Sequence, residues 1–132
     1  MLAWILGEPK GRAVSACLAG EELILTSEIT LIECERALIR AVHMNLFPES
    51  GAADRRTTLR LAAAHWSVLP LQAEIADRAR RTFPNEPVRA LDAIHLATLV
   101  VARALVPGLK ALTLDERIRR NAVDLGFEVV PD

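Results

Sequence analysis

The hydrophobic pattern of the chain is strongest in residues 89–102, where apolar residues recur at the spacing of an α-helix. Leu91, Ile94 and Leu99, together with their apolar neighbours, cover most of the helical surface, which predicts a largely buried helix. Asp92 is the one carboxylate near the start of this segment. Because a charged group is costly to bury without a partner, we expect Asp92 to lie where water or a cation reaches it.

Short apolar runs separated by longer helical patterns make up the rest of the chain. The runs predict strands, and the patterns between them predict helices that start or stop near Gly and Pro residues. Strands that alternate with helices indicate an α/β fold whose parallel sheet is covered by helices on both faces. The predicted strands are 23–26, 66–71, 110–114 and 127–130, and the predicted helices are 1–6, 10–18, 27–44, 48–65, 72–83, 89–102 and 115–125.

Two further acids follow predicted strands. Glu33 lies in the helix after the first strand, and Asp115 directly follows the third strand. Open α/β sheets bind their ligands beyond the carboxyl ends of the strands, so Glu33, Asp92 and Asp115 can meet there. Carboxylates gathered in one cleft repel each other, and a divalent cation that prefers oxygen ligands, chiefly Mg²⁺ or Mn²⁺, relieves this repulsion.

Each acid also has a purely structural interpretation. The segments 30–33 and 113–116 match the pattern of a capping box, in which Glu33 or Glu116 hydrogen-bonds the start of a helix. Asp92 and Asp115 would then complement the positive end of a helix dipole. The residue pattern leaves both interpretations open for every one of these acids.

A family resemblance is carried by three segments: residues 26–38 (TSEITLIECERAL), 89–97 (RALDAIHLA) and 112–130 (LTLDERIRRNAVDLGFEVV). In order and spacing they resemble the acid-bearing segments of PIN-domain ribonucleases, particularly the VapC toxins of toxin–antitoxin pairs. The resemblance implies a PIN-like three-layer α/β/α fold and Mg²⁺-dependent endonucleolytic hydrolysis of RNA, with Mn²⁺ able to replace Mg²⁺. It also implies that Glu33, Asp92 and Asp115 are the catalytic, metal-binding residues, and that Thr113 supports them.

The resemblance further implies two protein partners, a VapB-type antitoxin and a second copy of the chain that pairs through the N-terminal helices. The chain departs from the family at its start. Residues 2–9 correspond to the helix that follows the first, central strand, so we expect that strand and its metal-binding Asp to be absent. The alternative function is therefore a catalytically inactive or truncated PIN-like module that acts only through protein binding.

Composition narrows these predictions. At 132 residues, of which 52% are hydrophobic, the chain is predicted to be a single domain spanning residues 1–132. The net charge of −1 supplies no overall basic field to attract nucleic acid. Cys17 and Cys34 belong to no metal-binding pattern. We therefore expect both to be reduced thiols in a cytoplasmic protein. Trp4 and Trp66 are predicted to be core or interface anchors.

Overall fold

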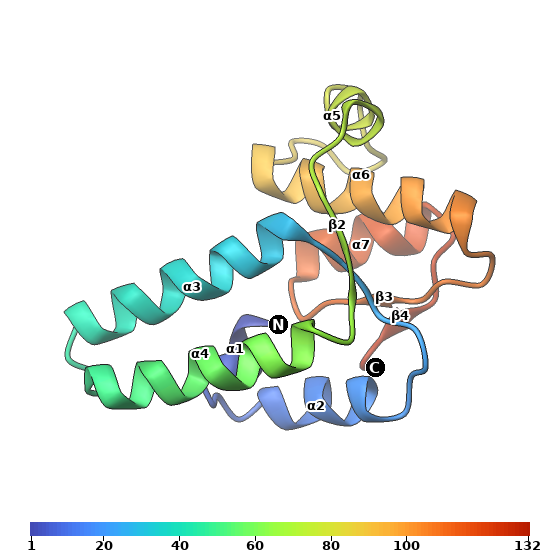
Figure 1. Ribbon diagram of the computed structural model, residues 1–132. Coiled ribbons are helices and arrows are strands. Elements are labelled where there is room, and N and C mark those ends of the chain that lie inside the picture. The colour runs from blue at the N-terminus through green and yellow to red at the C-terminus, as the bar shows by residue number, and fades with distance from the viewer. The chain divides into compact units, whose positions relative to one another are not determined.

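The computed structural model describes residues 1–132, which separate into two compact units, Met1–Val68 and Leu69–Asp132. Helices and short strands follow each other in the predicted order, so the α/β class is confirmed (Figure 1). The elements are α1 (Leu2–Ile5), α2 (Gly11–Ala19), β1 (Leu25–Ser27), α3 (Glu28–His43), α4 (Glu49–Ala63), β2 (Ser67–Leu69), α5 (Ala73–Ala79), α6 (Ala90–Leu105), β3 (Ala111–Leu112), α7 (Glu116–Asp124) and β4 (Val129–Val130).

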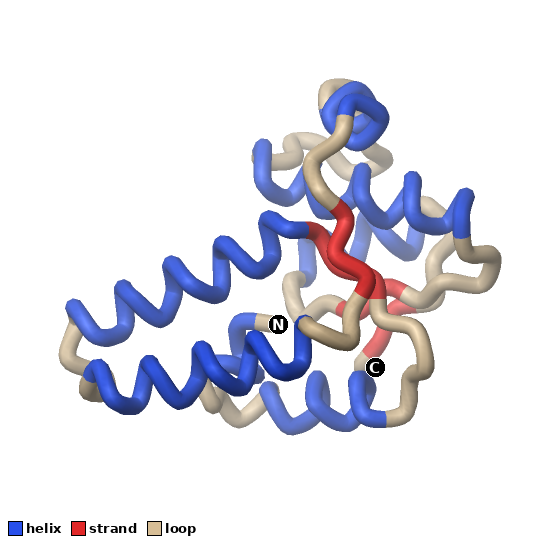
Figure 2. Tube along the Cα trace, viewed as in Figure 1, coloured by secondary structure: helices blue, strands red, loops and turns tan.

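The strands are short and form two separate pairs (Figure 2). β1 pairs with β2, and the backbone N–H of Ser67 donates to the carbonyl of Ile24 at 2.8 Å. β3 and β4 are parallel, with Ala111 opposite Val129 and Leu112 opposite Val130. The predicted parallel pairing is therefore present, although each strand contains only two or three residues.

In the unit Met1–Val68, α3 and α4 form a helical hairpin around a small apolar core (Figure 1). Leu38 and Cys34 of α3 are fully buried there and pack with Leu59 of α4 and Ile5 of α1. These positions repeat at helical spacing, and burying one large aliphatic side chain contributes about 1.5–3 kcal/mol. The apolar stripe of α3 thus decides which of its faces turns inward.

The first two helices approach each other closely at Gly11. A Cβ atom at this position would lie 2.4 Å from the carbonyl oxygen of Ala3 and 2.7 Å from the Cα of Trp4. The absence of a side chain at Gly11 therefore lets α2 pack directly on the backbone of α1. This contact fixes the part of α1 that carries Trp4.

Two arginines of α4 lie against the unit and do not point to solvent. Arg55 is half-buried over the ring of Phe47, with its guanidinium carbon 4.7 Å from the ring centre. Arg56 is also half-buried and donates to Glu35 at 3.1 Å and to Glu49 at 2.5 Å. Their long apolar stems and these local partners hold both side chains against the unit.

In the unit Leu69–Asp132, α6 packs against α5 and α7. Leu96, Ala97 and Val101 of α6 are buried with Ile75 of α5 and Phe83. The prediction of a largely buried α6 is correct for this stripe and wrong for its flanks. Leu91 is 47% exposed and Leu105 is 66% exposed, because only the stripe at positions i, i+3 and i+4 meets the neighbouring helices.

We predict that Leu38→Ala lowers the free energy of unfolding by about 2–5 kcal/mol, because it leaves a cavity in the core of the first unit. Ile39→Ala is the matched control: Ile39 is the next residue of α3 and is 43% exposed, so a change of about 0.5 kcal/mol or less is expected. Urea denaturation followed by tryptophan fluorescence measures both, since Trp4 and Trp66 lie in this unit. Equal losses in the two variants would contradict the assigned core.

Candidate functional site

Asp115 forms the N-cap of α7. Its Oδ1 accepts from the backbone N–H groups of Arg117 at 2.8 Å and Ile118 at 3.2 Å. Two otherwise unpaired amides at the helix start are satisfied in this way. Asp115 is exposed, and its second carboxylate oxygen, Oδ2, takes part in neither bond, so the cap leaves it available to a ligand.

The structure shows what two neighbours of Asp115, Thr113 and Glu116, do at the start of α7. Thr113 accepts a hydrogen bond at its Oγ1 from the backbone N–H of Asp115 at 3.1 Å, so it braces the backbone that carries the acid. The expectation that Glu116 is the cap is wrong. Glu116 is the first residue of α7, and its side chain pairs with Arg120 one turn later at 3.2 Å.

Asp92 lies in the first turn of α6, two residues after the first residue, Ala90. The helix has no side-chain cap, because the N-cap residue Arg89 contributes no side-chain hydrogen bond. Asp92 is half-buried, and its carboxylate is not used to cap the helix. Its position favours a negative charge, since the helix N-terminus carries a partial positive charge.

Glu33 lies in the second turn of α3 and is half-buried. The capping-box interpretation of Glu33 is wrong, because α3 begins earlier, with Ser27 as N-cap, and the Ser27 Oγ accepts from the amide of Ile29 at 3.2 Å. The surroundings of Glu33 include Cys34 and the amino group of Met1.

Burial is the largest cause of the pKa shifts of the two groups near Glu33, the Cys34 thiol and the Met1 amino group. It raises the pKa of the Cys34 thiol to about 11, so Cys34 is protonated at neutral pH and is a poor nucleophile. Burial also lowers the pKa of the Met1 amino group, and the nearby Cys34 and Glu33 side chains act in the opposite direction with a smaller effect. Cys34 is therefore not a candidate nucleophile, and Glu33 is the candidate functional group of this region.

The three predicted acids are distributed over both units: Glu33 belongs to Met1–Val68, and Asp92 and Asp115 belong to Leu69–Asp132. The structure contains no group of three or more His, Cys, Asp or Glu side chains arranged to hold a metal ion. Each of the three acids offers carboxylate oxygens, which suit a hard divalent cation, and one oxygen of Asp115 takes no part in the cap.

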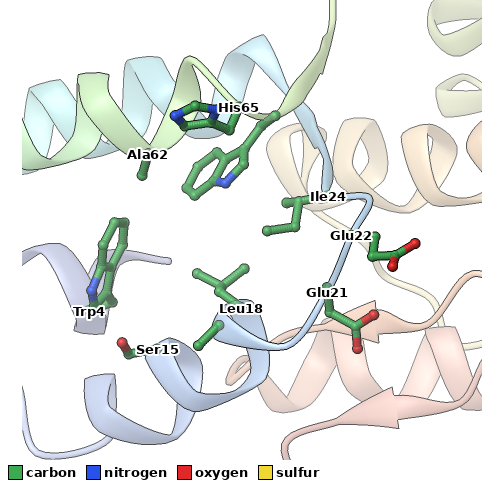
Figure 3. A pocket seen from close by; sticks show the side chains of 10 residues that line it. Trp4, Ser15, Leu18, Glu21, Glu22, Ile24, Ala62 and His65 are labelled. Carbon is green, nitrogen blue, oxygen red and sulfur yellow. The ribbon is translucent and has the colours of Figure 1, made fainter.

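A separate hollow lies within the unit Met1–Val68, with a volume of about 340 Å³ (Figure 3). Trp4 and Trp66 line it, with ring centres 6.1 Å apart and ring planes inclined by 48°. Leu18 and Ile24 add apolar surface, and Glu21, Glu22 and His65 add polar groups. Sequence reasoning predicted the two tryptophans as anchors but missed this hollow, because its lining comes from four separate segments.

Comparison with known proteins gives a consistent set of matches. The PIN domain family matches residues 1–124. The ribonuclease VapC35 of Mycobacterium tuberculosis is 36% identical over 106 residues, which cover 80% of this chain and 70% of the relative. The ribonuclease VapC46 of the same species is 39% identical over 95 residues, which cover 71% of this chain and 69% of the relative.

We predict that substitutions of Asp115 separate its capping role from its charge. Asp115→Ala should lower the free energy of unfolding by about 0.5–2 kcal/mol, because the amides of Arg117 and Ile118 lose their acceptor. Asp115→Asn keeps a good N-cap and should preserve stability within about 0.5 kcal/mol. Thermal and urea unfolding measure both variants. An Asp115→Ala protein as stable as the wild type would show that the cap contributes nothing.

Proposed function

The chain belongs to the PIN-domain family, and from this membership we propose that it is a VapC-type endoribonuclease, the toxin of a toxin–antitoxin pair. The observation that carries the proposal is the match to the PIN domain over residues 1–124, within which all three predicted acids fall. Two relatives named as ribonucleases support RNA as the substrate. The reaction is hydrolysis of a phosphodiester bond.

We propose Glu33, Asp92 and Asp115 as the residues that hold a divalent cation, with Thr113 bracing Asp115. PIN-domain nucleases depend on divalent metal, and the all-carboxylate donor set favours Mg²⁺, with Mn²⁺ as a substitute. When bound, such a cation makes water a better nucleophile and stabilises the negative charge that develops on the phosphate. Asp115 serves with one oxygen while its other oxygen holds the start of α7.

A second candidate function is a catalytically inactive PIN-like module that acts only by binding another protein. The two candidates differ in metal-dependent cleavage of RNA. The nuclease is preferred because the family match runs through both compact units, which we propose form one domain spanning residues 1–132.

We also propose a VapB-type antitoxin as the partner, with the hollow of Trp4 and Trp66 as part of its docking surface. Two tryptophans beside Leu18 and Ile24 suit an apolar side chain of the partner. Glu21 and Glu22 are exposed at this hollow, so charge complementarity selects a segment that is both apolar and basic.

The remaining proposals concern assembly and location. The chain pairs with a second copy through its N-terminal helices to form a homodimer, in line with the family resemblance. It acts in the cytoplasm, where an RNA substrate is present. No helix in the structure has the length and apolar character needed to cross a membrane.

We predict that excess EDTA abolishes cleavage of RNA and that added Mg²⁺ restores it. Asp92→Asn should reduce the cleavage rate by about two orders of magnitude or more, because it removes a charge on which the reaction depends. Asp77→Asn is the matched control, since Asp77 is an exposed acid of α5 that pairs only with Arg80. Cleavage rates with purified RNA, together with thermal melts of each variant, make the comparison.

Two results would contradict this mechanism. Cleavage that persists in excess EDTA would show that no metal is needed. A large loss of thermal stability in Asp92→Asn would show that Asp92 supports the helix start, and that the alternative structural interpretation is correct.

We predict that reversing the charge of the hollow weakens the complex with the small protein encoded beside this gene. Glu21→Lys combined with Glu22→Lys should lower the affinity by about tenfold at low salt, mainly by slowing association. Asp54→Lys, a change at an exposed acid of α4, is the control. Surface plasmon resonance at two salt concentrations measures both. If the double variant bound the partner with the same affinity as the wild type, the hollow would be excluded as the docking surface.

A further inference from the structure

Asn121 is a polar residue in a position where the pattern of α7 calls for an apolar one. It lies between Ile118 and Leu125, which pack against the apolar core of α6, and it is only 2% exposed. A buried amide without hydrogen bonds costs stability, so its partners explain why it is there. The side chains of the other two buried polar residues, Ser27 and Thr98, bond only to backbone groups of the helix that each caps or belongs to.

The side chain of Asn121 instead binds a different segment. Its Oδ1 accepts from the backbone N–H of Asn85 at 2.9 Å, and its Nδ2 donates to the carbonyl of Asn85 at 3.3 Å. The same Nδ2 donates to the carbonyl of Arg117 at 3.1 Å. Asn121 thus satisfies both backbone groups of Asn85 and joins α7 to a turn that lies 36 residues earlier in the chain.

The turn held by Asn121 leads directly into α6. The carboxylate of Glu86 closes the turn on itself, accepting from the amides of Phe83 at 2.9 Å and Val88 at 2.6 Å. Arg89 then begins α6 without a side-chain cap. The direction of the first turn of α6, which carries Asp92, therefore depends on how this turn is anchored.

We propose that Asn121 is a positioning residue for the pair Asp92 and Asp115. Both acids lie at helix starts within the unit Leu69–Asp132, Asp115 as the N-cap of α7 and Asp92 in the first turn of α6. Asn121 ties α7 to the segment that delivers α6, and so it holds one acid relative to the other. The inference rests on the proposed nuclease function and adds to it a residue that touches neither metal nor RNA.

The side chain of Asn85 provides a matched control. Its Nδ2 donates to Asp124 at 2.8 Å in an exposed bond, which is separate from the bonds between Asn121 and the Asn85 backbone. Asn85→Ala removes the exposed bond and leaves the backbone clamp in place. Asn121→Ala removes the clamp. Asn121→Asp keeps the shape and the acceptor but loses the donor to the two carbonyls, and it replaces Asn121→Ala in the comparison if that variant does not fold.

The experiment measures Mn²⁺ binding by calorimetry, and RNA cleavage as a function of Mn²⁺ concentration, for wild type, Asn121→Ala and Asn85→Ala. Residues that orient metal ligands typically affect metal affinity by about 10–100-fold. We expect Mn²⁺ to bind about tenfold more weakly to Asn121→Ala, with kcat at saturating Mn²⁺ changed by about threefold or less. Hydrogen exchange at the amide of Asn85 should accelerate in Asn121→Ala and stay unchanged in Asn85→Ala.

The outcomes separate this inference from the function on which it rests. If wild type neither binds Mn²⁺ nor cleaves RNA, the nuclease proposal fails and the positioning role fails with it. If wild type does both while Asn121→Ala loses thermal stability but keeps the wild-type Mn²⁺ affinity, only the positioning role is overturned. An Asn85→Ala protein with the same loss of affinity as Asn121→Ala also overturns it, because the backbone clamp would then be irrelevant.

Discussion

The start of α7 depends on a single carboxylate oxygen, the Oδ1 of Asp115, which holds the amides of Arg117 and Ile118. An α-helix leaves its first amides without partners, and a negatively charged acceptor at the N-cap satisfies them and complements the helix dipole. The second oxygen takes part in neither of these bonds. One oxygen thus meets the structural requirement of the helix, and the other is the one that we propose to bind the cation. Thr113 braces the backbone of Asp115.

The other helix starts show how differently acids can be held. In α3 the cap is provided by Ser27, which leaves Glu33 one turn further on without a capping role. In α6 no side chain caps the helix, and the preceding turn is fixed by Glu86 and Asn121 instead. Asp92 is therefore placed by contacts that lie outside its own helix. For this reason Asn121, a residue of α7, is proposed to position an acid of α6.

The apolar cores explain why these helix starts are stable platforms. Leu38, Cys34 and Leu59 hold α3 and α4 together in one unit, and Leu96 and Val101 hold α6 against its neighbours in the other. Protein interiors are densely packed, so a buried stripe fixes the rotation of a helix about its axis. The rotation of the helix in turn decides which residues of its first turns reach the surface.

The order and approximate limits of the helices and strands could be predicted from the sequence, because hydrophobic periodicity and Gly or Pro breaks are local properties. The three acids could be predicted as candidates for the same reason, since each stands at a recognisable distance from a strand or helix start. Whether Glu33, Asp92 and Asp115 together bind a metal remains a prediction, and the family match, not their geometry, supports it.

Only the tertiary structure decided which side chains are covered. The sequence pattern of α6 placed Leu91 in the interior, yet this residue is 47% exposed, because burial depends on which neighbours arrive from elsewhere in the chain. The hollow beside Trp4 and Trp66 and the clamp between Asn121 and Asn85 join residues far apart in sequence. By itself the sequence determined the local elements and the acids they carry. Their contacts depend on long-range packing, which local periodicity does not encode.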